Sequence, residues 1–368
     1  MTINIFLNIS DIASFIGQNK WDYITPFERL WKKYDKDGYH LCLENYNNQI
    51  HKKKEAVILL ENEKKKIELD LNNKNITKRQ YNKLVKENEL QTTRLIHDVT
   101  NLNNKIDSIK LTQSEKIEKA LGKDIIHTIS SSSKETEDKR KIAFDIIKTC
   151  EEEGKIDKEK KDELLKETES FINKTHGTLK EDSAIKLFEK EYNVTLDTSQ
   201  VYYRYKVYQD DMYNWYIGGK MDGLYVDHDD MNKNYVVEVK NRTKGFFSSL
   251  REYEKTQIQL YLLLTGFQHA KLVEKYNSRI RVTPIEMEKV YIDDILEYVC
   301  IFIKKMIQFL KNDEMKFNYF SMSESDKKKF IHELYLYDIN KLYEYKEELK
   351  IIQNEVEQDC LLSDLDEF

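Results

Sequence analysis

The chain has 368 residues, of which 34% are charged, and its 60 basic and 66 acidic side chains give a formal net charge of −6. This length allows two or three domains with a buried core, and only 10 glycines and 2 prolines argue against a collagen-like or loop-rich protein. Because the net charge does not attract nucleic acid, any nucleic-acid site must be a local basic groove.

Cysteine spacing and hydropathy exclude further classes. The four cysteines (Cys42, Cys150, Cys300 and Cys360) form no CxxC pair and no Cys/His ligand set, so we expect reduced thiols in a cytosolic setting and no structural zinc. The first residues lack a basic segment followed by a long apolar run, so no signal peptide is expected. No stretch approaches the roughly 18 apolar residues of a membrane span. The expected location is cytoplasmic.

Residues 1–40 are interpreted as an N-terminal helical part of the catalytic domain, with two short helices over residues 9–34. Ser10 is a suitable N-cap for the first helix, and Gly17 is suited to end it. Thr25 is expected to cap the second helix, with Pro26 in its first turn.

Residues 41–172 have a different texture, with charged heptad-like segments that predict a helical, coiled-coil-like insertion. Thr77 and Gln80 form a capping box that restarts the pattern after an Asn-rich break, so we expect an antiparallel helical hairpin. Between Lys52 and Lys110, basic residues outnumber acidic ones by about five. This arm either contacts phosphates or is a solvated arm of mixed charge, and it is also suited to oligomerisation.

Residues 173–312 are interpreted as an α+β core, and residues 313–368 as C-terminal helices with an acidic tail. The core pattern alternates strand-like apolar runs with helical segments, which predicts a central mixed sheet flanked by helices. The expected elements are a helix at 180–192, strands at 201–208, 213–226 and 235–240, a helix at 248–265 ended by Gly266, strands at 270–276 and 279–291, and a helix capped by Asp293 that ends near Leu310.

The segment from Gly218 to Lys240 carries the chemistry. It places Asp222 at the start of one apolar strand, and Glu238 and Lys240 on the next, where alternation sends both to one face with Val239 opposite. Residues 227–234 are polar enough for a hairpin loop, which would return Asp222 to the side of Glu238. Two carboxylates and an ammonium on one face predict metal-assisted phosphodiester cleavage. The alternative is a surface hairpin with solvated charges, although Asp and Glu disfavour strand interiors.

Two flanking helices add polar groups. Glu181, near the start of the helix expected at 180–192, is either an acid favoured by the helix dipole or a third carboxylate for metals. Tyr253, Gln257 and Tyr261 are spaced four apart on the second helix and share one face, from which an amide can bond water or the DNA backbone.

Two cations directly follow Lys240. Arg242 and Lys244 are placed to grip phosphates beside the scissile bond.

The ordered motifs resemble the PD-(D/E)xK nuclease superfamily and, more narrowly, the YqaJ-like viral recombinase family that includes the phage lambda exonuclease. The core motifs are Gly177-x-x-x-Glu181, Asp222-Gly, Glu238-x-Lys240 and Gln257-x-Gln-x-Tyr. The opening segment, Ser10-Asp-Ile-Ala-Ser-Phe-Ile-Gly followed by Thr25-Pro-Phe-Glu-Arg-Leu-Trp-Lys-Lys, is similar to that family's opening. The resemblance covers about residues 9–38 and 173–275, and nothing in it extends to the arm.

The resemblance implies a role for each matching residue. Asp222, Glu238 and the Val239 carbonyl would bind Mg²⁺ or Mn²⁺, as two ions, with Glu181 as an outer ligand. Lys240 would orient or deprotonate the attacking water, and Gln257 would position that water or the substrate. The residues expected to contact DNA are Ser10, Arg242, Lys244, Tyr253 and Tyr261.

The implied function is a metal-dependent DNA nuclease, a 5′→3′ exonuclease in viral recombination or end processing, acting in the host cytoplasm or a viral factory. Its implied partners are DNA, a homo-oligomer and a single-strand annealing protein, with no membrane. Lambda-type enzymes hold a 5′-phosphate with an arginine before the serine motif, but residues 1–9 contain no basic side chain, so that preference is not implied. The alternatives are a structure-specific endonuclease on the same core and a non-catalytic DNA-binding or scaffold protein that acts through the arm.

Overall fold

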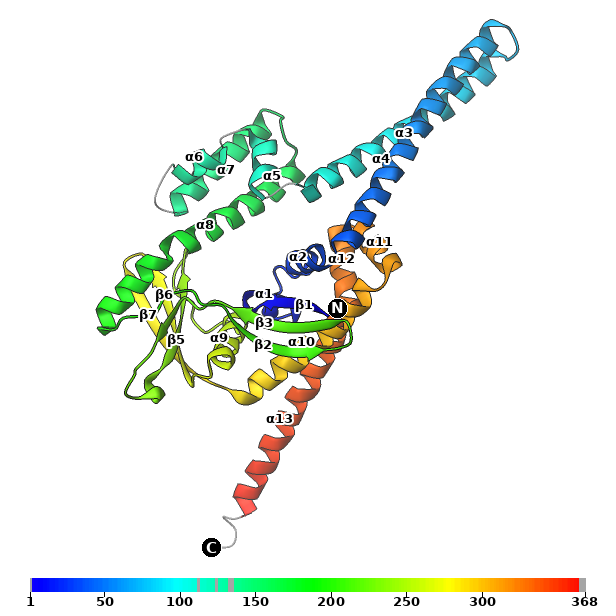
Figure 1. The fold of residues 1–368 in the computed structure, drawn as a ribbon. Coiled ribbons are helices and arrows are strands. Elements are labelled where there is room, and N and C mark those ends of the chain that lie inside the picture. The colour runs from blue at the N-terminus through cyan, green and yellow to red at the C-terminus, as the bar shows by residue number, and fades with distance from the viewer. Residues whose placement is uncertain (1, 111–112, 123–124, 132–135, 364–368) are drawn as a thin grey trace. The chain divides into compact units, whose positions relative to one another are not determined.

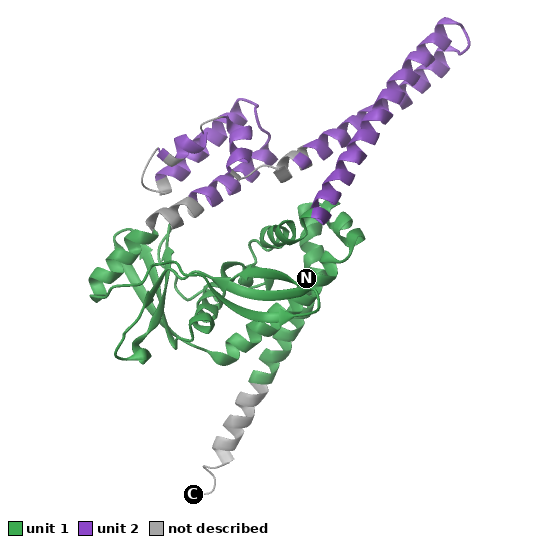
Figure 2. Ribbon diagram, viewed as in Figure 1, with its two compact units in different colours: residues 1–36, 176–368 green, residues 37–175 purple. Residues whose placement is uncertain are grey.

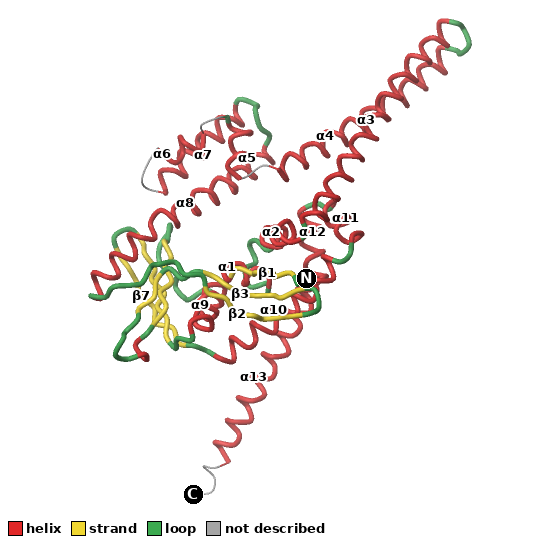
Figure 3. The backbone as a smooth tube through the Cα atoms, viewed as in Figure 1, coloured by secondary structure: helices red, strands yellow, loops and turns green. Residues whose placement is uncertain are grey.

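The structure is a computed structural model that describes residues 2–110, 113–122, 125–131 and 136–363 (Figure 1). The chain forms two compact units (Figure 2): unit 1 contains residues 1–36 and 176–368, and unit 2 contains residues 37–175. Both sheets belong to unit 1, whereas the described part of unit 2 is built from helices joined by loops (Figure 3). The unit boundaries fall close to the ends predicted for the insertion.

The first sheet of unit 1 has three strands in the order β1–β3–β2, with β1 parallel and β2 antiparallel to β3. Ile5, Leu7, Trp215 and Ile217 are at most 1% exposed, so one face of this sheet belongs to the core. Its strands are β1 (Ile3–Asn8), β2 (Tyr203–Gln209) and β3 (Tyr213–Gly219).

The second sheet has four strands in the order β4–β5–β6–β7; β5 and β6 are parallel and the other pairs antiparallel. Val237 and Val239 of β5 pack with Ala184 and Phe188 of helix α8, which gives this sheet an apolar face. Its strands are β4 (Gly223–Tyr225), β5 (Tyr235–Asn241), β6 (His269–Tyr276) and β7 (Arg279–Glu286).

The N-terminal and C-terminal helices of unit 1 share one aromatic core. The rings of Phe27 and Trp31 pack on Phe309 and Tyr319, so the C-terminal helices belong to the same compact unit as the N-terminal ones. The helices of this unit are α1 (Ile9–Phe15), α2 (Ile24–Tyr34), the later part of α8 (Lys158–Tyr192), α9 (Glu252–Thr265), α10 (Lys289–Leu310), α11 (Asp313–Ser321), α12 (Glu324–Ile331), a π-helical turn (His332–Leu336) and α13 (Tyr337–Ser363).

Unit 2 begins with an antiparallel hairpin of two long helices, as predicted. Lys64 Nζ lies 2.7 Å from Glu89 Oε1 across the pair, and Thr77 and Gln80 form the predicted capping box with reciprocal bonds of 2.9 and 3.3 Å. Shorter helices follow and share a small isoleucine-rich core. The helices are α3 (Lys36–Asn72), α4 (Lys78–Lys110), α5 (Gln113–Leu121), α6 (Ile125–Ser131) and α7 (Thr136–Glu152).

The predicted single central sheet is wrong, because the strand predicted at 213–226 is two strands in different sheets. The chain turns at residues 220–222, between Gly219 and Gly223. A Cβ at Gly219 would lie 3.0 Å from the Tyr261 ring, so helix α9 packs against the backbone where β3 ends. Strand β1 is not among the predicted strands, although Ile3, Ile5 and Leu7 alternate in its sequence.

Several predicted helix ends differ from the structure. Asn8 precedes α1 where Ser10 was expected as the cap, and Tyr23 precedes α2 in place of Thr25. Helix α10 begins after Glu288, earlier than a cap at Asp293 would place it. Gly266 does end α9, in the left-handed conformation with φ of 73°. In these helices the apolar stripe extends past the polar residue that marked the expected cap.

The acidic tail predicted at the C-terminus ends at residues 364–368, which lie outside the described residues. Within the described ranges, no helix is both long and apolar enough to cross a membrane.

Candidate active site

The β4–β5 hairpin brings Asp222 to Glu238, as the sequence predicts. Gly223 pairs with Val237, and the Val239 N–H donates a hydrogen bond of 2.7 Å to Asp222 Oδ2. The connecting loop holds itself together, because the Asn234 side chain accepts a hydrogen bond of 2.7 Å from the Asp227 N–H. Asp222 lies in the bend just before β4, so its carboxylate is fixed by the backbone of the neighbouring strand.

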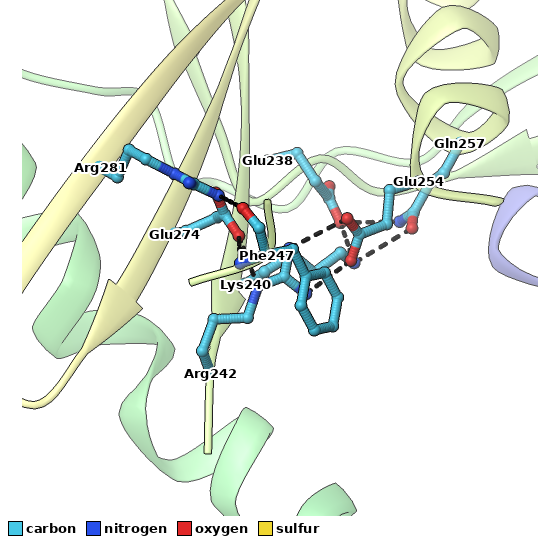
Figure 4. Close-up of polar contacts among 8 residues, drawn as sticks. All are labelled: Glu238, Lys240, Arg242, Phe247, Glu254, Gln257, Glu274 and Arg281. Carbon is cyan, nitrogen blue, oxygen red and sulfur yellow. Dashed lines mark hydrogen bonds and ion pairs between the residues drawn. The ribbon is translucent and has the colours of Figure 1, made fainter. Parts of the chain in front are cut away.

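Glu238, Lys240 and Gln257 form one hydrogen-bonded cluster between β5 and α9 (Figure 4). Lys240 Nζ donates to Glu238 Oε1 at 2.6 Å and to Gln257 Oε1 at 3.1 Å, and Gln257 Nε2 donates to Glu238 Oε1 at 2.8 Å. The Glu238 side chain is 3% exposed, and its Oε2 atom is buried with no hydrogen-bond donor among the described residues. A buried carboxylate oxygen without a donor is available for a cation.

The surroundings of the cluster disfavour the ionised form of the Asp222 and Glu238 carboxylates and favour the charged form of Lys240. Burial raises the pKa of Asp222 well above its ordinary value, and the Glu238 and Glu181 carboxylates raise it further. Burial also raises the pKa of Glu238, although Lys240 opposes that shift. Burial alone would lower the pKa of Lys240, but Glu238 and Asp222 outweigh it and the pKa is raised. Lys240 is therefore an ammonium at neutral pH.

Helix α9 orients Gln257 through a residue that was expected to touch DNA. Tyr261 is 5% exposed, and its hydroxyl accepts a hydrogen bond of 3.2 Å from Gln257 Nε2. Its place beneath the cluster corrects the prediction of a DNA contact. Gln259, the second glutamine of the motif, bonds the Glu286 carbonyl and the Glu288 N–H and so has a packing role.

Arg242 is part of a buried ion network and is not presented to solvent. Its guanidinium is 8% exposed, donates to both Glu254 oxygens at 2.7 and 2.9 Å and to Glu274 at 2.7 Å, and lies 3.9 Å from the Phe247 ring centroid (Figure 4). Arg281 bonds the other oxygen of Glu274. The prediction that Arg242 grips a phosphate is therefore wrong, because two buried carboxylates already match its charge.

Glu254 and Glu274 were not predicted as site residues. Helical spacing could have indicated Glu254, since it lies three residues before Gln257 on the same helix. No local pattern could have indicated Glu274.

The remaining predicted residues are spread around the cluster. Glu181 lies close enough to raise the pKa of Asp222, but from the interior of α8 and not near a helix start, so the dipole interpretation does not apply. Tyr253 is half-buried, and burial raises the pKa of its hydroxyl, with Arg242 and Lys240 opposing that shift. Lys244 and Ser10 are exposed, and their contacts with DNA stay predictions.

The cluster can hold a metal ion only if a backbone carbonyl joins its side-chain carboxylates as a ligand. Across the described ranges, no three His, Cys, Asp or Glu side chains gather as a ready-made metal site. The donor set that remains is the two carboxylates of Asp222 and Glu238 with the Val239 carbonyl, and hard oxygen donors of this kind suit Mg²⁺ or Mn²⁺. The unpartnered Glu238 Oε2 is the observation that favours such a cation.

No known family profile and no curated protein matches the chain. Among solved structures, it is similar to one described as SSO0001, with 20% identity over 42% of this chain and 68% of that one and a TM-score of 0.28. It is also similar to an alkaline exonuclease from Laribacter hongkongensis, with 16% identity over 38% of this chain and 71% of that one and a TM-score of 0.30. The same exonuclease in complex with dAMP gives a TM-score of 0.29. Similarities this low carry no argument about function.

Proposed function

We propose that the protein is a metal-dependent DNA nuclease that hydrolyses phosphodiester bonds with Asp222, Glu238, Lys240 and Gln257. The single observation that supports this most is the buried Glu238 carboxylate, one oxygen of which bonds Lys240 and Gln257 while the other has no donor. Burying this oxygen without a partner costs free energy, which a bound cation beside it would offset.

Each residue has a role that its geometry allows. Asp222, Glu238 and the Val239 carbonyl would hold Mg²⁺ or Mn²⁺, with two ions expected and Glu181 as an outer ligand. Bound cations would supply the charge that stabilises the attacking and leaving oxygens of phosphoryl transfer. Lys240, held as an ammonium, orients the attacking water and offsets charge on the phosphate. Gln257 bonds the same water from α9, with its amide oriented by Tyr261.

The resemblance to YqaJ-like recombinases supports a 5′→3′ exonuclease in viral recombination or end processing. The expected partners are then DNA, further copies of this chain and a single-strand annealing protein. A structure-specific endonuclease uses the same chemistry on a different DNA shape.

The test is digestion of end-labelled duplex DNA with Mg²⁺, comparing blunt, recessed, nicked and circular substrates. A 5′→3′ exonuclease releases nucleotides from a 5′ label and spares covalently closed circles. Cleavage of closed circles would instead show an endonuclease. Absence of cleavage of every substrate with either Mg²⁺ or Mn²⁺ would favour a non-catalytic DNA-binding protein.

A further inference from the structure

The open face of the β1–β3–β2 sheet carries a pocket that the family resemblance does not explain. The pocket is also distinct from Asp222, Glu238, Lys240 and Gln257, which we call the cleavage cluster. The pocket has a volume of about 580 Å³ and is lined by Phe6, Asn8, Lys33, Tyr202 and Arg204. These residues come from β1, α2, the start of β2 and the residue just before it, all within unit 1. Aromatic rings and cations therefore meet on a sheet surface that faces away from the core.

The aromatic part of the pocket is built from stacked rings. Phe6 and Tyr216 are cross-strand neighbours on β1 and β3, and their ring centroids are 5.2 Å apart in a stacked arrangement. Tyr202 is 42% exposed and covers Gly218 of β3, where an added Cβ would lie 2.6 Å from the tyrosine hydroxyl. Glycine at position 218 thus allows the Tyr202 ring to lie against the sheet.

The charged part of the pocket consists of cations without acidic partners. Arg204 lies 5.5 Å from the Tyr216 ring centroid, and Lys33 lies 4.9 Å from the Tyr34 ring centroid. Neither side chain forms an ion pair with a carboxylate among the described residues, whereas Lys240, Arg242 and Arg281 of the other sheet do. The nearby acids Asp210 and Asp211 lie in the β2–β3 turn, at the opposite end of these strands.

Segments next to the pocket are linked to Asp222 in sequence and, by a hydrogen bond, to the neighbouring Met221. Gly218 is four residues before Asp222 in the sequence. Four amino-acid residues span at most about 14 Å. This distance corresponds to about four nucleotides of DNA, which are spaced about 3.4 Å apart along one strand. Gln200, which precedes Tyr202 by two residues, donates a hydrogen bond of 3.3 Å to the Met221 carbonyl. The segment that carries Tyr202 is therefore anchored to the residue next to Asp222.

We infer that this face is a binding platform for single-stranded DNA, in which bases stack on Tyr202 and Phe6 while Lys33 and Arg204 contact the backbone phosphates. Stacking rings beside uncompensated cations are what sequence-independent binding of a single strand requires. The inference rests on the proposed nuclease function, because it assigns the platform to the strand that adjoins the scissile bond. A folded duplex presents no free base faces to such rings.

The test is fluorescence anisotropy with the full chain and a labelled oligothymidine of about 12 nucleotides, in EDTA so that no cleavage occurs. Tyr202→Ala should weaken binding by roughly five- to 150-fold, the range measured for loss of one base–aromatic stack. Tyr202→Phe keeps the ring and should stay within about twofold of the wild type. Tyr205→Ala is the matched control, since this tyrosine is 43% exposed on β2 and alternation places it on the face opposite Arg204.

The phosphate contact has its own readout. Arg204→Ala should reduce the slope of log affinity against log salt by about 0.7, the value for one phosphate contact on a single strand. An unchanged slope would overturn the assignment of Arg204 to phosphate.

Failure of this inference is distinguishable from failure of the proposed function. Unchanged oligothymidine binding by Tyr202→Ala, or an equal loss with Tyr205→Ala, overturns the platform even if the protein cleaves DNA. An equal loss of affinity for a blunt duplex overturns the commitment to a single strand. Tyr202-dependent binding by a protein that cleaves no DNA with any metal supports the platform and overturns the nuclease.

Discussion

At the scale of single residues, Asp222 is a position where a substitution can remove the negative charge without disturbing the local structure. The Asp222 side chain accepts a hydrogen bond from the Val239 N–H, and an asparagine oxygen accepts this bond equally well. Asp222→Asn should therefore abolish cleavage while it leaves DNA affinity nearly unchanged, because the amide loses the negative charge that a cation needs. Single-turnover cleavage with Mg²⁺ and binding in EDTA measure the two effects. Full Mg²⁺-dependent activity in this variant would remove Asp222 from the site.

The same variant tests the metal site without reference to activity. Burial raises the pKa of Asp222 in the folded protein, so its ionised form costs stability at every pH above the unfolded pKa, and the asparagine variant should unfold at an equal or higher temperature in EDTA. Added Mg²⁺ or Mn²⁺ should stabilise the wild type, by about 2.7 kcal/mol at 100 times the dissociation constant, and should not stabilise the variant. Equal stabilisation of both proteins would place the cation elsewhere.

Lys240 is expected to act on the cleavage rate. Lys240→Ala should lower the single-turnover rate by a factor of order 10² to 10⁴, the range for loss of a positioned charge or proton-transfer group. Lys233→Ala is the control, because that lysine lies 64% exposed in the adjoining hairpin loop and pairs only loosely with Asp227 and Asp230. A decrease of less than about tenfold for Lys240→Ala would assign this lysine a structural role.

At the scale of elements, the Arg242 network ties the end of β5 to α9 and β6. Arg242 follows Lys240 by two residues, and Glu254 precedes Gln257 by three on α9. The buried ion pair therefore fixes the distance between the strand that carries Glu238 and the helix that carries Gln257. Lys240 and Gln257 meet only if these elements keep that distance.

We expect Glu254→Gln to destabilise the protein by about 3 to 5 kcal/mol, because it leaves the Arg242 guanidinium buried with half of its acidic charge. Urea denaturation measures the free energy of unfolding, and the cleavage rate should decrease with it. Glu286→Gln is the matched control, since that side chain is exposed on β7 and should change stability by less than about 0.5 kcal/mol. Equal stability of the two variants would show that the network contributes nothing to the position of α9.

The predictable part of this site is the part set by local periodicity. Alternation along one strand was enough to place Glu238 and Lys240 on one face, and helical spacing placed Gln257 on the site-facing side of α9. The partners of Arg242 were not predictable, because Glu254 and Glu274 follow it by 12 and 32 residues on other elements and no local pattern reports such contacts. Strand β1 pairs with β3 at Asn4 and Asn214, which is the same difficulty over a separation of 210 residues.

The division into two sheets was not predictable for the same reason. The apolar run over residues 213–226 matches one long strand, and no local pattern reports that Tyr261 packs against Gly219 where β3 ends. The predicted helix starts are wrong for a related reason. A polar side chain can cap a helix in isolation, but tertiary packing can extend the helix to residues that precede it.

At the scale of the whole molecule, the residues proposed to be catalytic and the helical arm belong to different units. All the residues of the cleavage cluster and of the single-strand platform lie in residues 1–36 and 176–368. Unit 2 has its own hairpin and its own isoleucine-rich core. For the proposed nuclease, we therefore expect unit 2 to act on contacts with long DNA or with other copies of the chain, and not to complete the site.

Replacement of residues 37–175 by a Gly/Ser linker tests that division. A linker of about 20 residues has a root-mean-square length of about 22 to 27 Å and reaches at most about 70 Å, so it does not force the two ends of unit 1 together. We expect a folded protein with the wild-type single-turnover rate on short duplexes, because every residue of the cluster is retained. If the arm contacts phosphates, affinity for long DNA should show a shallower salt dependence in the deletion variant; if it serves assembly alone, only the mass from light scattering should change. An insoluble product, with the cleavage cluster intact in sequence, would show that unit 2 is part of the folding core and not an insertion.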